Sequence, residues 1–145
     1  MNSTFGHRIF KEKRLLVQYF NGPLTLQVAI EAKKAQIADP DYDPTFSLIL
    51  DFRNTTPSFS KSDIQLFVEN LRREADINPN RRAMITSTPN QAAYYMIVQH
   101  IASSSAMNYQ VVSTIEAALG WIGEDVRLTD LIKDTIEEIR AGLEA

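Results

Sequence analysis

Short apolar runs alternate along this chain with stretches in which apolar residues recur every three or four positions. Five runs with strand character lie at residues 7–11, 14–20, 46–52, 81–88 and 109–114. Helical spacing predicts helices at residues 26–39, 60–75, 91–105 and 115–123. The order β-β-α-β-α-β-α-β-α, with short connections, predicts an α/β domain built on a single mixed, mostly parallel sheet of about five strands with helices packed against it.

Two places along the chain are expected to interrupt the strands. Asn21-Gly22-Pro23 should break the chain after the opening hairpin, and Asp51 should end the central buried strand at its carboxyl end. The polar segment NTTPSFS at residues 54–60 is then predicted to turn the chain and to cap the next helix.

The helix at residues 26–39 carries two neighbouring apolar faces, which suggests that it is covered on both sides. One face holds Leu26, Ile30 and Ile37, and the other holds Val28, Ala32 and Ala35.

The helix at residues 60–75 has the clearest start signal in the chain. Ser60 is a typical N-cap residue, and Asp63 three positions later forms an acidic variant of the capping box. Leu66 points away from the apolar stripe of this helix. The stripe itself consists of Ile64, Phe67, Val68, Leu71 and Ala75.

Residues 124–145 form an extra element after the alternating region. Their apolar positions predict an amphipathic helix that either packs on its own domain or forms the contact of a homodimer. We therefore expect a domain at residues 1–123 and a C-terminal helical extension at residues 124–145. The apolar stripe of the extension is Leu128, Ile132, Thr135, Ile139 and Leu143.

Composition narrows the function classes. The chain has 145 residues, 44% hydrophobic and 23% charged, which fits one globular domain with a core of its own. The net charge of −3 supplies no positive field for nucleic acid. Cysteine is absent, which excludes disulfides and thiolate chemistry, and no run approaches the ~18 apolar residues needed to span a bilayer. Without an apolar stretch for a signal peptide at the N-terminus, we expect a cytoplasmic protein.

Catalytic signals are sparse. The sequence has no glycine-rich nucleotide loop and no paired spacing of metal ligands, so we expect no cofactor and no metal. Asp51 and His100 are the candidates for acid–base chemistry, and each is more often structural in such a position. Asp51 can cap the following loop, and Arg53 lies on the same side of the strand and can neutralise it.

Aromatic residues gather near the predicted carboxyl ends of the strands. They can line a cleft for an apolar small molecule or form ordinary core, and their spacing does not decide between the two. The set comprises Phe52, Phe59, Tyr94, Tyr95, Tyr109 and Trp121.

The order of several short motifs resembles a known family. A hairpin, the segment FNGPLT, a helix ending in DPDYDP, the run LILDFR, and YQVVST before IEAALGWIG follow one another over roughly residues 8–123. This order resembles the sporulation anti-anti-sigma-factor-like (SpoIIAA-like) domains of the STAS superfamily. The resemblance implies a non-catalytic regulatory module with a protein partner, and relatives in this fold group are suspected of holding apolar ligands.

The resemblance also implies a place for phosphorylation. In well-known members a kinase partner phosphorylates a serine of an Asp-Ser-Ser-Gly motif at a helix N-terminus. The matching segment here is SFSKSD, in which Phe59 replaces the aspartate and no glycine follows Ser60 and Lys61. Ser60 and Ser62 remain as candidate hydroxyl groups.

Three functions are consistent with these observations. The first is a regulatory or protein-interaction module, with a homodimer as one form. The second is a carrier or sensor of an apolar small molecule, and the third is a small enzyme that uses Asp51 or His100. The candidate residues for binding a ligand or partner follow the third strand and its neighbours: Asp51, Arg53, Thr55, Phe59, Ser60, Ser62, Leu66, Tyr94 and Tyr95.

Overall fold

The computed structural model describes residues 4–75, 80–103 and 107–145, with the backbone alone for residues 72–75. Within these ranges no helix combines the length and hydropathy that crossing a membrane requires. The elements in chain order are β1 (Thr4–Phe10), β2 (Leu15–Leu24), α1 (Leu26–Ala38), β3 (Ser47–Pro57), α2 (Lys61–Ala75), β4 (Arg81–Ile85), α3 (Pro89–Ser103), β5 (Asn108–Val112), α4 (Ile115–Ile122) and α5 (Thr129–Glu144).

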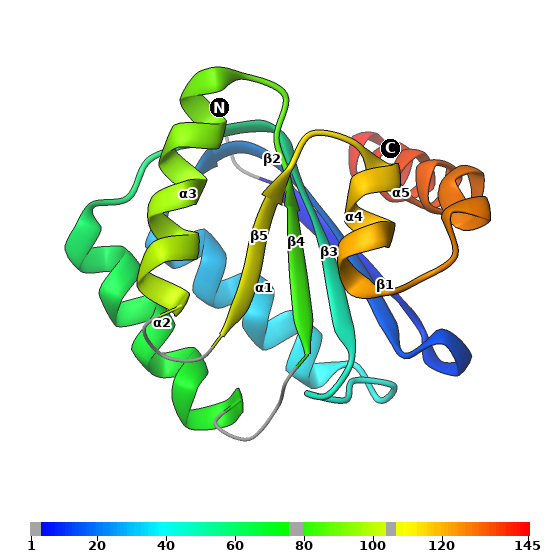
Figure 1. Cartoon of the computed structure of the whole chain (residues 1–145), viewed down its shortest axis with the longest axis horizontal. Coiled ribbons are helices and arrows are strands. Elements are labelled where there is room, and N and C mark those ends of the chain that lie inside the picture. Colours follow the sequence, from blue (N-terminus) through cyan, green and yellow to red (C-terminus); the bar gives the residue numbers. More distant parts are fainter. Residues whose placement is uncertain (1–3, 76–79, 104–106) are drawn as a thin grey trace.

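The strands form a five-stranded sheet in the order β1-β2-β3-β4-β5. β1 runs antiparallel to β2, and the remaining neighbours are parallel. Helices α1, α2 and α3 cover one face of the sheet, while α4 and α5 cover the other (Figure 1). The predicted fold class, a mixed and mostly parallel sheet with helices on it, is confirmed.

Two hydrophobic cores lie on the two faces of the sheet. Because successive side chains of a strand point to opposite faces, Leu48, Leu50 and Phe52 of β3 join the core beneath α1–α3. Ile49 joins the core beneath α4 and α5. Asp51 shares the side of Ile49, so it points away from the core beneath α1–α3.

The expected break at Asn21-Gly22-Pro23 is wrong, because β2 continues through these residues to Leu24. Residues 21–24 pair in parallel with residues 54–57 of β3, and the register shifts between Tyr19 and Asn21. Gly22 has φ 91°, a backbone conformation that favours glycine. Gly22 therefore permits a local irregularity within a long strand, and the pairing with β3 keeps the chain extended.

β3 also runs further than expected. Asp51 lies in its middle and pairs with Ile85, the last residue of β4, while β3 itself continues to Pro57. Only residues 58–60 separate β3 from α2. The expectation that Asp51 ends the central strand is therefore wrong, and most of the NTTPSFS segment is strand.

The start of α2 matches its predicted capping box. The Asp63 backbone N–H donates to Ser60 Oγ over 3.1 Å, and the Ser60 N–H donates to Asp63 Oδ2 over 3.0 Å. α1 departs from its prediction, since Ile37 is 44% exposed and the buried residues of α1 are Ala32 and Gln36. α1 is thus covered on one side only.

α5 packs on the sheet through Ile132, Ile136 and Ile139. A glycine in β1 makes this approach close, because a Cβ atom on Gly6 would lie 2.8 Å from Ile139 Cγ2. The C-terminal helix therefore contributes to the second core of the same sheet.

Candidate functional site

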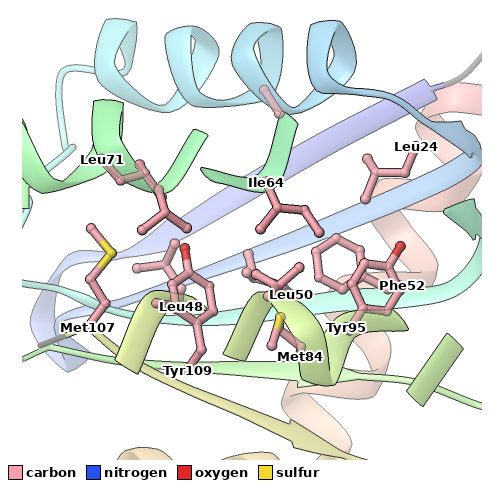
Figure 2. Close-up of a cluster of buried hydrophobic side chains, with 14 of the residues drawn as sticks. Leu24, Leu48, Leu50, Phe52, Ile64, Leu71, Met84, Tyr95, Met107 and Tyr109 are labelled. Carbon is pink, nitrogen blue, oxygen red and sulfur yellow. The ribbon is translucent and has the colours of Figure 1, made fainter. Parts of the chain in front are cut away.

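A cavity of about 80 Å³ lies between the sheet and helices α1, α2 and α3. Each water molecule needs about 10–15 Å³ of such space, so the cavity has room for roughly six water molecules or a ligand of similar size. Figure 2 shows Leu50 and Met84 of the sheet facing Ile64 of α2 in this region. The lining is mainly apolar and includes Leu24, Leu50, Phe52, Ile64, Met84 and Tyr95.

The inner face of α1 explains why this space is open. Residues 29, 32, 33 and 36 follow helical spacing and line the cavity as Ala29, Ala32, Lys33 and Gln36. Alanine side chains fill less of the space above the sheet than larger residues would, which agrees with the unfilled volume at this place. Side chains of α2 and α3 fill the remaining part of the same layer.

Two glutamine side chains form the buried polar part of the cavity wall. Gln18 of β2 and Gln36 of α1 are 0% and 4% exposed, and Gln36 Nε2 donates a hydrogen bond to Gln18 Oε1. Among the described residues, Gln18 Nε2 and Gln36 Oε1 have no hydrogen-bond partner. Each such buried group costs about 1–3 kcal/mol when it stays unpaired.

Two cations also line the cavity, and each contacts a tyrosine ring. Lys33 Nζ donates to Tyr42 Oη over 2.9 Å and lies 5.0 Å from the centre of that ring. Arg82 is 2% exposed, and its Cζ lies 5.2 Å from the centre of the Tyr109 ring. Burial raises the pKa of the Tyr109 hydroxyl, so this hydroxyl stays neutral. The Tyr109 side chain forms part of the cavity wall.

Aromatic side chains close one end of the cavity. The rings of Phe52 and Tyr95 stack with their centres 4.4 Å apart (Figure 2). Tyr95 Oη and Thr55 Oγ1 are 2.8 Å apart, and Thr55 Oγ1 donates to the carbonyl oxygen of Phe52 over 2.7 Å. Phe59 and Tyr94 meet edge to face at 5.4 Å. Four of the predicted binding residues therefore come together: Thr55, Phe59, Tyr94 and Tyr95.

Asp51 and Arg53 lie apart from this group, on the side of the sheet that α4 and α5 cover. Asp51 is 2% exposed, and it accepts hydrogen bonds from Arg53 N at 3.0 Å and from Arg53 Nε and Nη2 at 2.9 Å each. The hydrogen bond with Asp51 raises the pKa of the Arg53 guanidinium. Arg53 neutralises Asp51 as the sequence suggested. Neither residue of the pair lines the cavity.

Ser60, Ser62 and Leu66 lie at the start of α2 and are exposed. Ser60 Oγ already accepts the capping bond, and it lies 3.3 Å from Ser62 Oγ. Leu66 is 58% exposed and points outward as expected. These three residues form part of the molecular surface and do not line the cavity.

The acid–base pairing that an enzymatic function would need does not form between the two candidate residues. His100 is exposed on α3, and Asp51 faces the opposite side of the sheet and is bound by Arg53. No described hydrogen bond joins a side chain to the His100 ring.

Sequence reasoning missed the two glutamines and the short inner face of α1. Gln18 does carry a signal, because it is a polar residue inside the apolar run LLVQYF. Its partner Gln36 has no comparable signal, since a glutamine on a helix is usually solvated.

Comparisons with known proteins identify the fold. No protein-family model matches the sequence, and no curated protein is significantly similar to it. A search of solved structures finds an uncharacterized protein of the DUF3478 family with a SpoIIAA-like fold from Shewanella loihica PV-4. The two share a TM-score of 0.53 at 14% identity, over 83% of this chain and 93% of that one. The chain therefore has a SpoIIAA-like fold, which confirms the resemblance at the level of architecture.

Proposed function

We propose that this domain is a non-catalytic cytoplasmic module that binds a small, mainly apolar molecule in the cavity beneath α1. The observation that carries the proposal is the cavity of about 80 Å³, because well-packed cores leave few spaces larger than one water molecule. Its lining is apolar apart from a few polar groups, which is the usual composition of a small-molecule site.

Geometry supports binding over catalysis. The buried carboxylate of Asp51 is neutralised by Arg53 and points to the other core, while His100 is exposed. At the aromatic end of the cavity, the Tyr95 hydroxyl forms a hydrogen bond with Thr55 Oγ1. Burial raises the pKa of the Tyr95 hydroxyl. These groups stabilise the fold, and none is placed beside the cavity as an activated acid, base or nucleophile.

The experiment that tests the proposal is a titration of the ¹⁵N-labelled protein with short alkyl compounds, followed by NMR. Wild type should show shifts that saturate and that concentrate around the cavity. Ala32→Leu extends a branched side chain from the buried inner face of α1 and should abolish these shifts. Ala35→Leu is the matched control, because Ala35 lies on the same helix and does not line the cavity. Equal binding by both variants, or no saturable binding to wild type, would refute the proposal.

A second candidate is a regulatory module that binds a protein partner or a second copy of the chain. Exposed apolar side chains on α2 and α3 favour it, since Leu66, Met96 and Ile97 are 58%, 55% and 43% exposed. Ser60 and Ser62 would be its phosphorylation sites, because phosphate is favoured at the start of a helix.

Sedimentation velocity tests the homodimer form of this candidate. Leu66→Gln should weaken a homodimer that uses this surface, whereas Gln65→Ala, at the exposed neighbouring position, should not. A wild-type protein that stays monomeric at all concentrations would remove the homodimer.

A further inference from the structure

We infer that the ligand carries a neutral group that both donates and accepts hydrogen bonds, such as a hydroxyl, and that Gln18 and Gln36 bind this group. The inference rests on the proposed function, because it names the chemistry of the molecule that the cavity holds.

Two unpaired polar atoms on the buried glutamines support the inference. The side chains of Gln18 and Gln36 are almost completely buried, they line the cavity, and one hydrogen bond joins them. That bond leaves the Nε2 donor of Gln18 and the Oε1 acceptor of Gln36 unpaired. Turning both amides over exchanges these roles but still leaves one donor and one acceptor open.

Complementarity to one donor and one acceptor selects a neutral partner. A carboxylate can accept from Gln18 Nε2, but it has no proton to give to Gln36 Oε1. An ammonium group donates to Gln36 Oε1 and has no lone pair for Gln18 Nε2. A hydroxyl or a primary carboxamide satisfies both positions, so these are the groups that the pair recognises.

The apolar part of the cavity lining determines the rest of the ligand. Leu48, Leu50 and Phe20 line the space around the glutamines and offer no hydrogen bonds. Beside these apolar side chains a water molecule finds no hydrogen-bond partner, whereas the amides offer one. An alkyl chain with one terminal hydroxyl fits both parts, and the cavity volume corresponds to a ligand of roughly six non-hydrogen atoms.

The test compares four probes of nearly equal length: 1-pentanol, 1-chloropentane, pentanoate and pentylammonium. Each is titrated into wild type and into the double variant Gln18→Leu/Gln36→Leu, with NMR detection of the backbone and of the glutamine side-chain amides. In wild type, 1-pentanol should bind about tenfold more tightly than 1-chloropentane, the effect of two neutral hydrogen bonds. It should also shift the side-chain NH₂ resonances of Gln18 and Gln36, which 1-chloropentane should leave in place.

The double variant should lose the preference and keep the binding. Its leucines match the apolar surroundings but offer no partner to a hydroxyl, so 1-pentanol should bind no more tightly than 1-chloropentane. The shift of the wild-type NH₂ resonances tests the same point without any substitution, should the variant fail to fold.

Three results would overturn the inference, and they separate it from the proposed function. Equal binding of 1-pentanol and 1-chloropentane to wild type would mean that only water meets the amides, while the cavity remains a binding site. Tightest binding by pentanoate, lost in Arg82→Met, would assign recognition to the buried guanidinium and to an anion. Failure of all four probes at their solubility limits would refute the cavity as a site.

Discussion

Removing the guanidinium of Arg53 should destabilise this protein strongly, because it leaves the Asp51 carboxylate buried with one backbone N–H as partner. Breaking a buried ion pair from one side costs about 3–5 kcal/mol. The Arg53 side chain is 35% exposed, so water can replace part of the lost interaction, and we expect about 2–3 kcal/mol for Arg53→Met. For a domain of this length that loss lowers the melting temperature by roughly 10 °C. Urea unfolding and calorimetry measure both quantities.

The chain contains a matched control for this prediction. Asp125 and Arg127 repeat the Asp-x-Arg arrangement with the same three kinds of hydrogen bond, but their side chains are 43% and 88% exposed. Arg127→Met should therefore cause no measurable loss of stability, because solvent screens an exposed pair. Equal effects of the two substitutions would contradict the reasoning from burial.

The same pair tests whether Asp51 acts in binding. Asp51→Asn should lower stability less than Arg53→Met, because the amide oxygen can still accept from the Arg53 backbone N–H. It should leave the affinity for a short alkyl probe unchanged, because Asp51 faces the side of the sheet opposite the cavity. Loss of binding in a folded Asp51→Asn protein would refute this assignment.

Three further substitutions test other parts of the structure. Tyr95→Phe removes the hydrogen bond to the Thr55 hydroxyl and should lower the free energy of unfolding in urea by about 1 kcal/mol. Ser60→Ala removes the N-cap of α2 and should cost about 1 kcal/mol in the same assay. The backbone N–H of Asp41 contributes most to lowering the pKa of Asp39 below its ordinary value of 3.8, so the stability from Asp39 exists above that pH and disappears as pH falls through the lower folded value. Asp39→Asn should therefore lose less stability than wild type between about pH 5 and pH 2, as measured by urea unfolding across that range.

Hydrophobic periodicity predicted the elements of the fold because each one has its own apolar pattern. Its boundary errors came from local signals that the sheet overrides. Asn21-Gly22-Pro23 reads as a break in isolation, yet these residues pair with residues 54–57 of β3 and remain strand. Turn propensity of a few residues is weak compared with a continuous ladder to a neighbouring strand, which the sequence alone does not reveal.

Only part of the predicted set of binding residues lies together in the structure. The sequence left two roles open for the aromatic residues near the strand ends, a cleft lining or ordinary core. In the structure Phe59 and Tyr95 line the cavity beneath α1, and Tyr94 packs against both of them. Asp51 and Arg53 were placed in the same set because Asp51 was expected to end the central strand at its carboxyl end, where parallel sheets bind ligands. The alternation of side chains sends them to the opposite face, and the faces can be assigned only when the positions of the helices are known.

The unequal packing of the two faces of the sheet connects this fold to its proposed function. Beneath α4 and α5, large branched side chains such as Leu119, Ile132 and Ile136 fill the core, and they are at most 3% exposed. Beneath α1, the helix presents alanine and glutamine to the sheet, and the cavity remains. We therefore expect the proposed ligand to occupy the cavity without disturbing the core that α5 completes. An unfilled cavity lowers the stability of the fold. The well-packed core beneath α4 and α5 can offset this loss, because it stabilises the same sheet.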